Sequence, residues 1–238
     1  MSALRRLLAT IAGALGVLVG MTTAAAADVT YVPSPNNGQK VYLSQSCHDR
    51  GSGSCQDNVG CPEHIGENAW SESLARAALR DNTGWGGLLD RQYIVRRGTG
   101  LTWQNIKSSN AWGALMHIPL HSNASPWDCT APYKDSTFGT WGMYVSNNGK
   151  QLATQLMKRI GPASPGTNDK IVKRRDLGEL NQTRAVAGYL EAEFHTYGAG
   201  VEWLEDVEDW DWRLGYAVDK CRGYPREGGK ALSKICTW

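Results

Sequence analysis

The chain has 238 residues, of which 25 are Lys or Arg and 23 are Asp or Glu, so its formal net charge at pH 7 is only +2. A chain of this length, with 41% hydrophobic residues, can form one domain with a full core, or at most a domain with a small appendage. The charge balance argues against a nucleic-acid-binding protein, because binding to phosphates needs a clear basic excess.

The first 27 residues have the pattern of a secretory signal peptide. Arg5 and Arg6 precede an apolar stretch at residues 7–20 that is too short to cross a bilayer comfortably, and Ala25-x-Ala27 offers a cleavage site. We therefore predict that residues 1–27 are removed and that residues 28–238 form one secreted domain without a membrane anchor. An uncleaved anchor is the alternative. Without Arg5 and Arg6 the remaining chain is formally neutral.

Six cysteines follow the predicted cleavage site: Cys47, Cys55, Cys61, Cys129, Cys221 and Cys236. An even number of cysteines in an exported chain indicates disulfide bonds. Proximity in the sequence favours the pairs Cys55–Cys61 and Cys221–Cys236, which leaves Cys47–Cys129. The alternative is a cysteine-ligated zinc site, which is disfavoured because the chain has no Cys-x-x-Cys pair.

Segments with strand patterns alternate with amphipathic helical segments along the chain. Strands are predicted at residues 40–45, 91–98, 114–122, 140–146 and 185–197, and helices at residues 67–82, 102–113, 149–161 and 198–221. The last helix would bury a stripe of Trp203, Val207, Trp210, Leu214 and Ala217. Its solvated face would carry Asp206, Glu208, Asp209 and Asp211. The alternation predicts an α/β fold, in which a mostly parallel, twisted sheet carries helices on both faces of a single domain.

Four polar residues fall where the elements of such a sheet meet its carboxyl edge. His48 follows the first strand, Glu67 opens the next helix, His121 ends the third strand, and Glu191 lies near the end of the last. Ligand groups gather at this edge of a parallel sheet, so we expect these side chains to lie close together. Two imidazoles and a carboxylate hold Zn²⁺ and leave a position for water. We predict zinc ligation by His48, Glu67 and His121, with Glu191 as the general acid/base.

Nearby residues compete for two of these roles. Glu63 or His64 can replace Glu67 as a ligand, because both lie in the same loop. Glu193 can replace Glu191, because residues two apart in a strand point to the same face. The spacing of residues around Glu191, described below, favours Glu191.

A second histidine lies four residues before His121 on the same predicted strand. Residues four apart in a strand share a face, so His117 would lie deeper in the core, and we interpret it as a structural, hydrogen-bonded histidine. An imidazole ligand also needs an outer partner to fix its tautomer. The sequence does not show which residue supplies that partner.

The motifs around these residues match a known pattern in order and spacing over most of residues 40–214. Ser46–Asp49 occupies the place of an Asp-Pro-Gly-His-Gly-type turn, and Glu67 that of a Glu at the start of the first helix. Pro119–Ala124 reads like Ser-Ile-His-Ala-Asn-Ala, and Glu191–His195 like Glu-x-Gly-Phe followed by His. In these motifs the chain resembles the zinc-dependent N-acetylmuramoyl-L-alanine amidases of bacterial cell walls and phage endolysins.

The resemblance implies a secreted zinc hydrolase that cleaves the amide bond between N-acetylmuramic acid and L-alanine in peptidoglycan. It supports the three zinc ligands and Glu191 as the acid/base. We further assign Asn123 and His195 to substrate binding, although His195 can instead cap a loop, and we expect a monomer. Two departures from the pattern are Cys47, next to the first ligand, and Glu193, each in place of a glycine. The alternatives are a non-catalytic binding protein for cell-wall glycan on a degenerate amidase fold, and a zinc peptidase acting within the stem peptide.

Overall fold

The structure is a computed structural model and describes residues 28–49, 51–58, 60–61, 63–79, 86–125, 129, 135–206, 208 and 210–222. The predicted signal peptide lies outside the described residues. None of the helices in these ranges is long and apolar enough to cross a membrane.

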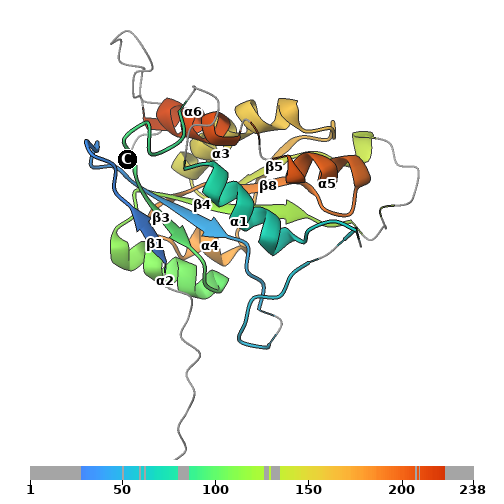
Figure 1. Ribbon diagram of the computed structural model, residues 1–238, viewed down its shortest axis with the longest axis horizontal. Helices are drawn as coiled ribbons and strands as arrows, with labels where there is room; N and C mark the ends of the chain where they lie inside the picture. The colour runs from blue at the N-terminus through green and yellow to red at the C-terminus, as the bar shows by residue number, and fades with distance from the viewer. Residues whose placement is uncertain are drawn as a thin grey trace, which may run out of the picture.

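One mixed sheet runs through the described part of the chain (Figure 1). Its strands are β1 (Val29–Tyr31), β2 (Lys40–Gln45), β3 (Ile94–Gly98), β4 (Met116–Asn123), β5 (Trp141–Tyr144), β6 (Lys170–Lys173), β7 (Val186–Ala187) and β8 (Tyr189–Phe194). Their order is β1-β3-β2-β4-β8-β5-β6, and β7 pairs with β4 beside this path. Only the pairs β1·β3 and β5·β8 are antiparallel in these ranges, so the predicted mostly parallel sheet is confirmed.

Helices cover both faces of this sheet, as predicted. Helices α1 (Glu67–Ala77), α3 (Asn147–Ile160) and α6 (Trp210–Arg222) pack together on one face. Helices α2 (Thr102–Trp112) and α4 (Gly178–Asn181) lie against the other (Figure 1). Helix α5 (Gly198–Glu205) follows β8, and two short 3₁₀ helices occupy Asp135–Thr137 and Gly161–Ala163.

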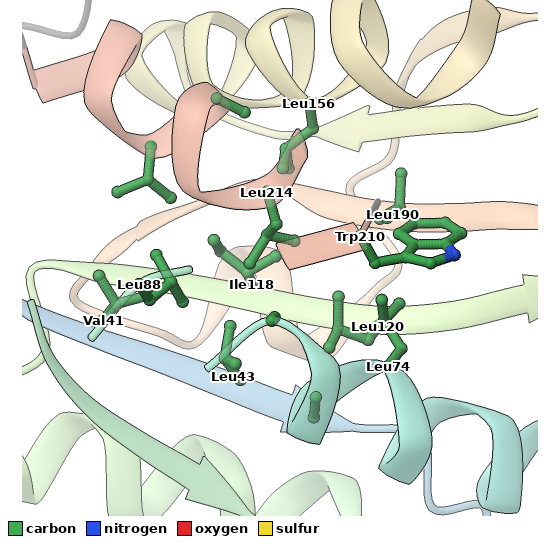
Figure 2. Close-up of a cluster of buried hydrophobic side chains, with 14 of the residues drawn as sticks. Val41, Leu43, Leu74, Leu88, Ile118, Leu120, Leu156, Leu190, Trp210 and Leu214 are labelled. Atoms are coloured by element: carbon green, nitrogen blue, oxygen red, sulfur yellow. The ribbon is translucent and has the colours of Figure 1, made fainter. Parts of the chain in front are cut away.

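The main core lies between the sheet and the helices α1, α3 and α6. Figure 2 shows Ile118 and Leu120 of β4 facing Leu74 of α1 and Leu214 of α6. All four side chains are fully buried, and burial of each contributes about 1.5–3 kcal/mol to stability. Because side chains alternate along a strand, the core residues of β4 leave the odd-numbered positions, including His121, to the opposite face.

Two predicted boundaries are wrong at the ends of helices. The helix predicted at residues 198–221 is divided, because α5 ends at Glu205 and α6 begins at Trp210. This division lets Trp210 pack against Trp203 and Trp70, with ring centroids 4.8 Å and 6.0 Å away. The first helix ends at Ala77, short of the predicted residue 82, although residues 80–82 lie outside the described ranges.

The predicted faces of the last helix are partly corrected. Trp210, Leu214 and Ala217 are buried as predicted, and Val207 lies outside the described residues. Asp211 is buried instead of solvated. The break before α6 places Asp211 in the first turn of a helix, where its Oδ1 accepts the N–H of Trp212 and an acidic group is favoured by the helix dipole.

The disulfide prediction is wrong for two of its three pairs. The structure pairs Cys47 with Cys55 and Cys61 with Cys129. An antiparallel bridge between His48 and Gln56 folds the loop back on itself and brings Cys47 and Cys55 together, which proximity in the sequence does not reveal. Cys221 is disulfide-bonded, but its predicted partner, Cys236, lies outside the described residues.

Candidate metal centre

Three elements bring His48, Glu67 and His121 to one edge of the sheet. His48 follows β2, His121 lies near the end of the neighbouring parallel strand β4, and Glu67 is the first residue of α1. One ligand-type atom from each of these residues lies within 4.8 Å of the others. The predicted convergence of the three is therefore confirmed, while their role as metal ligands stays a prediction.

The carboxylate of Glu67 lies between the two imidazoles. Its Oε1 is 2.9 Å from Nδ1 of His121, and its Oε2 is 3.0 Å from Nε2 of His48. The same carboxylate accepts the backbone N–H of Ser122 at 3.2 Å and the side-chain amide of Asn58 at 2.7 Å. These contacts hold the side chain in one orientation before any ion binds.

The start of α1 is built to present Glu67. Asp57 accepts the N–H of Asn68, and it packs so closely against Gly66 that a Cβ there would lie 2.2 Å from the Asp57 carboxylate carbon. Asp57 thus satisfies one of the free N–H groups at the helix start in place of an N-cap side chain. The positive end of the helix dipole also favours the Glu67 carboxylate at this position.

The centre has one open side. The side chains of Glu67 and His121 are only 2% and 3% exposed, whereas that of His48 is 39% exposed. Burial alone would raise the pKa of Glu67, but hydrogen bonds to His121 and His48 bring it well below its ordinary value. Burial alone would lower the pKa of His121, but its two carboxylate neighbours, Glu179 and Glu67, raise it to about 10.

This donor set fits a zinc ion. Two imidazole nitrogens and one carboxylate oxygen form the three-ligand set typical of catalytic zinc sites. A buried carboxylate needs positive partners when no ion is bound. Within the described ranges both ion-pair partners of Glu67 are histidines. A divalent cation bound between these side chains would replace the protons that make the two histidines positive, and it would balance the negative charge of Glu67.

Glu191 lies beside the centre on the next strand. In the parallel pairing of β4 and β8 it stands opposite His121. Glu191 is half-buried as a residue. Its Oε2 atom is buried and has no hydrogen-bond partner in the described part of the chain. Burial raises the pKa of Glu191 to about 7, with His121 opposing and Glu67 adding to the shift. A carboxyl group with a pKa near neutrality suits general acid/base chemistry.

The competing acid, Glu193, is occupied elsewhere. Its side chain is fully buried, and its Oε1 accepts the N–H of Gly166 at 2.8 Å. The pairing of β4 and β8 also changes register between His121 and Asn123, so regular alternation does not continue past Glu191. These contacts favour Glu191 as the acid/base.

The competing ligands before α1 also lie outside the three-residue cluster. Glu63 is exposed, and Nδ1 of His64 is 3.1 Å from a carboxylate oxygen of Glu205 at the end of α5. Of the three candidates, Glu67 is the one whose carboxylate contacts both histidines in the described structure.

Asn123 and His195 lie near the centre but make local contacts. The backbone carbonyl of Asn123 accepts the N–H of His195, and its Oδ1 accepts the N–H of Ala124. The His195 ring is 4% exposed, and its Nδ1 is 2.9 Å from Oγ of Ser122, the residue whose N–H also reaches Glu67. Their part in substrate binding stays a prediction.

Sequence reasoning missed Glu179, which reaches the centre from the other side of His121. Its Oε2 lies 3.4 Å from Nε2 of His121. Glu179 belongs to the short helix α4, within residues 161–181, a segment that the sequence places beside the cleft but to which it assigns no contact. Only the packing of α4 against the sheet brings this carboxylate to His121.

Comparison with known proteins gives a likeness of fold. No protein-family model matches the chain, and neither does any curated protein sequence. Solved structures do match. The catalytic domain of CwlV, an N-acetylmuramoyl-L-alanine amidase from Bacillus (Paenibacillus) polymyxa var. colistinus, is 16% identical, with a TM-score of 0.58 over 76% of this chain and 93% of that chain.

Two further structures give the same result. The catalytic domain of the CD27L endolysin, which targets Clostridia Difficile, is 19% identical, with a TM-score of 0.57 over 76% of this chain and 95% of that one. An N-acetylmuramoyl-L-alanine amidase from Clostridium difficile 630 is 15% identical, with a TM-score of 0.59 over 77% and 94% of the two chains. The chain therefore has the fold of N-acetylmuramoyl-L-alanine amidase catalytic domains.

Proposed function

We propose that this protein is a zinc-dependent amidase that cleaves the bond between N-acetylmuramic acid and L-alanine in peptidoglycan. The observation that carries the proposal is the cluster of His48, Glu67 and His121, with Glu191 opposite His121 on the next strand. The fold likeness supports it, because the similar structures include amidases of this kind.

In the proposed reaction three residues bind the metal ion and a fourth transfers the proton. His48, Glu67 and His121 would hold the zinc ion, which supplies a Lewis acid for the amide carbonyl and lowers the pKa of water. Glu191 takes a proton from the attacking water and passes it to the leaving amine of L-alanine. Within the described part of the chain its Oε2 makes no hydrogen bond, and its raised pKa lets it hold and release a proton near neutral pH.

The proposed place of action is outside the cell. The segment at residues 1–27 has the signal-peptide pattern, and the two disulfides in the described part of the chain are typical of an oxidising compartment. Peptidoglycan is an extracellular substrate, so the predicted export and the proposed activity agree.

Digestion of purified peptidoglycan by the zinc-loaded protein tests the proposal. We expect soluble stem peptides that carry a new free N-terminal alanine. Glu191→Gln should abolish their release, with at least a hundredfold loss, and should leave zinc bound. Glu193→Gln is the matched comparison, because its amide oxygen can still accept from Gly166, and it should retain activity.

Other outcomes would point to the alternatives. New amino termini on other residues would mean a peptidase acting within the stem peptide. Retention of peptidoglycan by a protein that contains no zinc and releases no peptides would mean a binding protein. An active Glu191→Gln variant beside an inactive Glu193→Gln variant would move the acid/base role to Glu193.

A further inference from the structure

A second buried carboxylate lies behind the candidate metal centre, on the face of the sheet covered by α2 and α4. Glu179 of α4 is only 2% exposed. Its Oε1 accepts a hydrogen bond from the Ser44 hydroxyl and lies 3.0 Å from Nε2 of His117. Its Oε2 lies 3.4 Å from Nε2 of His121. One carboxylate thus joins a core histidine to a candidate metal ligand.

The surroundings fix this carboxylate from two sides. Asn105 donates to Oγ of Ser44 at 2.9 Å, and Nδ1 of His117 lies 3.0 Å from Oγ of Ser109. Both Asn105 and Ser109 come from α2, and both are fully buried. An ionised carboxylate can only accept, so Nε2–H of His117 and the Ser44 hydroxyl both donate to Oε1 of Glu179, and Oε2 is left facing His121.

A buried carboxylate is costly unless it is paired. Within the described ranges the ion-pair partners of Glu179 are two histidines, and none is Lys or Arg. A purely structural pairing would be complete with His117 and Ser44 alone. The second oxygen lies 3.4 Å from the buried Nε2 of His121, and no other residue in the described part of the chain makes a hydrogen bond to that nitrogen.

The orientation of the His121 ring decides which of its two nitrogens faces each carboxylate. Nδ1 faces Glu67 on the side of His48, and Nε2 faces Glu179. An imidazole that binds a metal through one nitrogen carries its proton on the other, where an acceptor fixes the tautomer and raises the basicity of the ligand. We propose that Glu179 is a positioning residue that accepts Nε2–H of His121 and so keeps Nδ1 available to the metal ion.

Zinc affinity, with the pH held constant, tests this role in the full mature protein. The inference rests on the zinc site of the proposed function but needs no hydrolysis to be measured. Competition with a chromophoric chelator should show that Glu179→Gln binds zinc about 10- to 100-fold more weakly than the unaltered protein. Asp219→Asn is the matched control, because Asp219 is equally buried but pairs with Arg91 and Tyr93, away from the centre. Its zinc affinity should not change.

The tautomer of His121 is a second measurement, and it does not depend on whether Glu179 also stabilises the fold. In the zinc-loaded, ¹⁵N-labelled protein, proton–nitrogen correlation of the imidazole should show a protonated Nε2 and a metal-bound Nδ1. This measurement needs no variant, so it holds even if Glu179→Gln fails to fold. Zinc on Nε2, or equal zinc affinity in Glu179→Gln, would overturn the inference. Absence of zinc binding by the unaltered protein would instead overturn the proposed function.

Discussion

Glu191 and Glu193 of β8 show how contacts distinguish two residues that strand alternation alone places on the same face. Glu191 and Glu193 both have a pKa raised to about 7, mainly by burial. Glu191 stands opposite a candidate metal ligand, whereas Glu193 binds the backbone of Gly166. A raised pKa alone therefore does not identify a catalytic acid, and the neighbours decide.

The pKa of Glu193 makes the stability of the fold depend on pH. A carboxyl whose pKa is raised in the folded state holds its proton more tightly there than in the unfolded chain. The contribution of Glu193 to the free energy of unfolding is therefore fully present below pH 4–5 and is lost as the pH rises toward 7. Glu193→Gln cannot ionise. Relative to the unaltered protein, it should gain on the order of 2 kcal/mol in the free energy of unfolding between pH 5 and pH 8.

Urea unfolding of both proteins at the two pH values, in the presence of a chelator, measures this gain. The other titrating groups are common to both proteins, so they cancel in the difference. An equal difference at both pH values would show that Glu193 does not keep its proton in the folded protein.

Two disulfide bonds fasten the loops around the candidate metal centre. Cys47–Cys55 closes the loop next to His48, and Cys61–Cys129 ties the loop before α1 to a segment 68 residues away. In the chain-entropy description a disulfide stabilises more when it closes a longer loop, because it restricts the unfolded chain more.

Removal of the two disulfides should therefore have unequal effects. We expect Cys61→Ser with Cys129→Ser to lower the free energy of unfolding by about 4 kcal/mol, and Cys47→Ser with Cys55→Ser by about 2.5 kcal/mol. Urea unfolding without reductant measures both losses. A larger loss for the short loop would mean that local contacts at His48, and not chain entropy, dominate.

The candidate metal centre joins the segment after β2 to α1 and β4, so an ion bound there would connect separate parts of the fold. Because the unfolded chain does not hold the three ligands together, binding should stabilise the folded state through mass action. Free zinc at 100 times its dissociation constant should raise the free energy of unfolding by about 2.7 kcal/mol.

Unfolding in zinc buffer and in chelator measures this linkage. His121→Ala serves as the comparison, because it removes one ligand-type nitrogen and should lose the zinc-dependent gain. A stabilisation by zinc that persists in His121→Ala would place the ion elsewhere on the protein.

Local sequence patterns were sufficient to predict the layered fold and the three residues that cluster at the candidate metal centre. Strand patterns at residues 40–45 and 114–122 and a helix opening at Glu67 were enough to place three ligand-type residues at one sheet edge, since parallel strands end together. These signals are local: periodicity, a helix start, and a polar residue at the end of an apolar run. The correctly predicted structural role of His117 followed from the same strand periodicity.

Features that depend on packing between distant segments became visible only in the folded protein. The Cys47–Cys55 pair followed from a loop that folds back on itself, and Cys61–Cys129 joins segments 68 residues apart. The break before α6 accompanies the packing of Trp210 against Trp70 and Trp203. The contact between Glu179 and His121 joins residues 58 positions apart through α4, which is too short and polar to predict. Such contacts leave no periodic pattern in the sequence, because they form only when separate helices and strands pack around the same buried region.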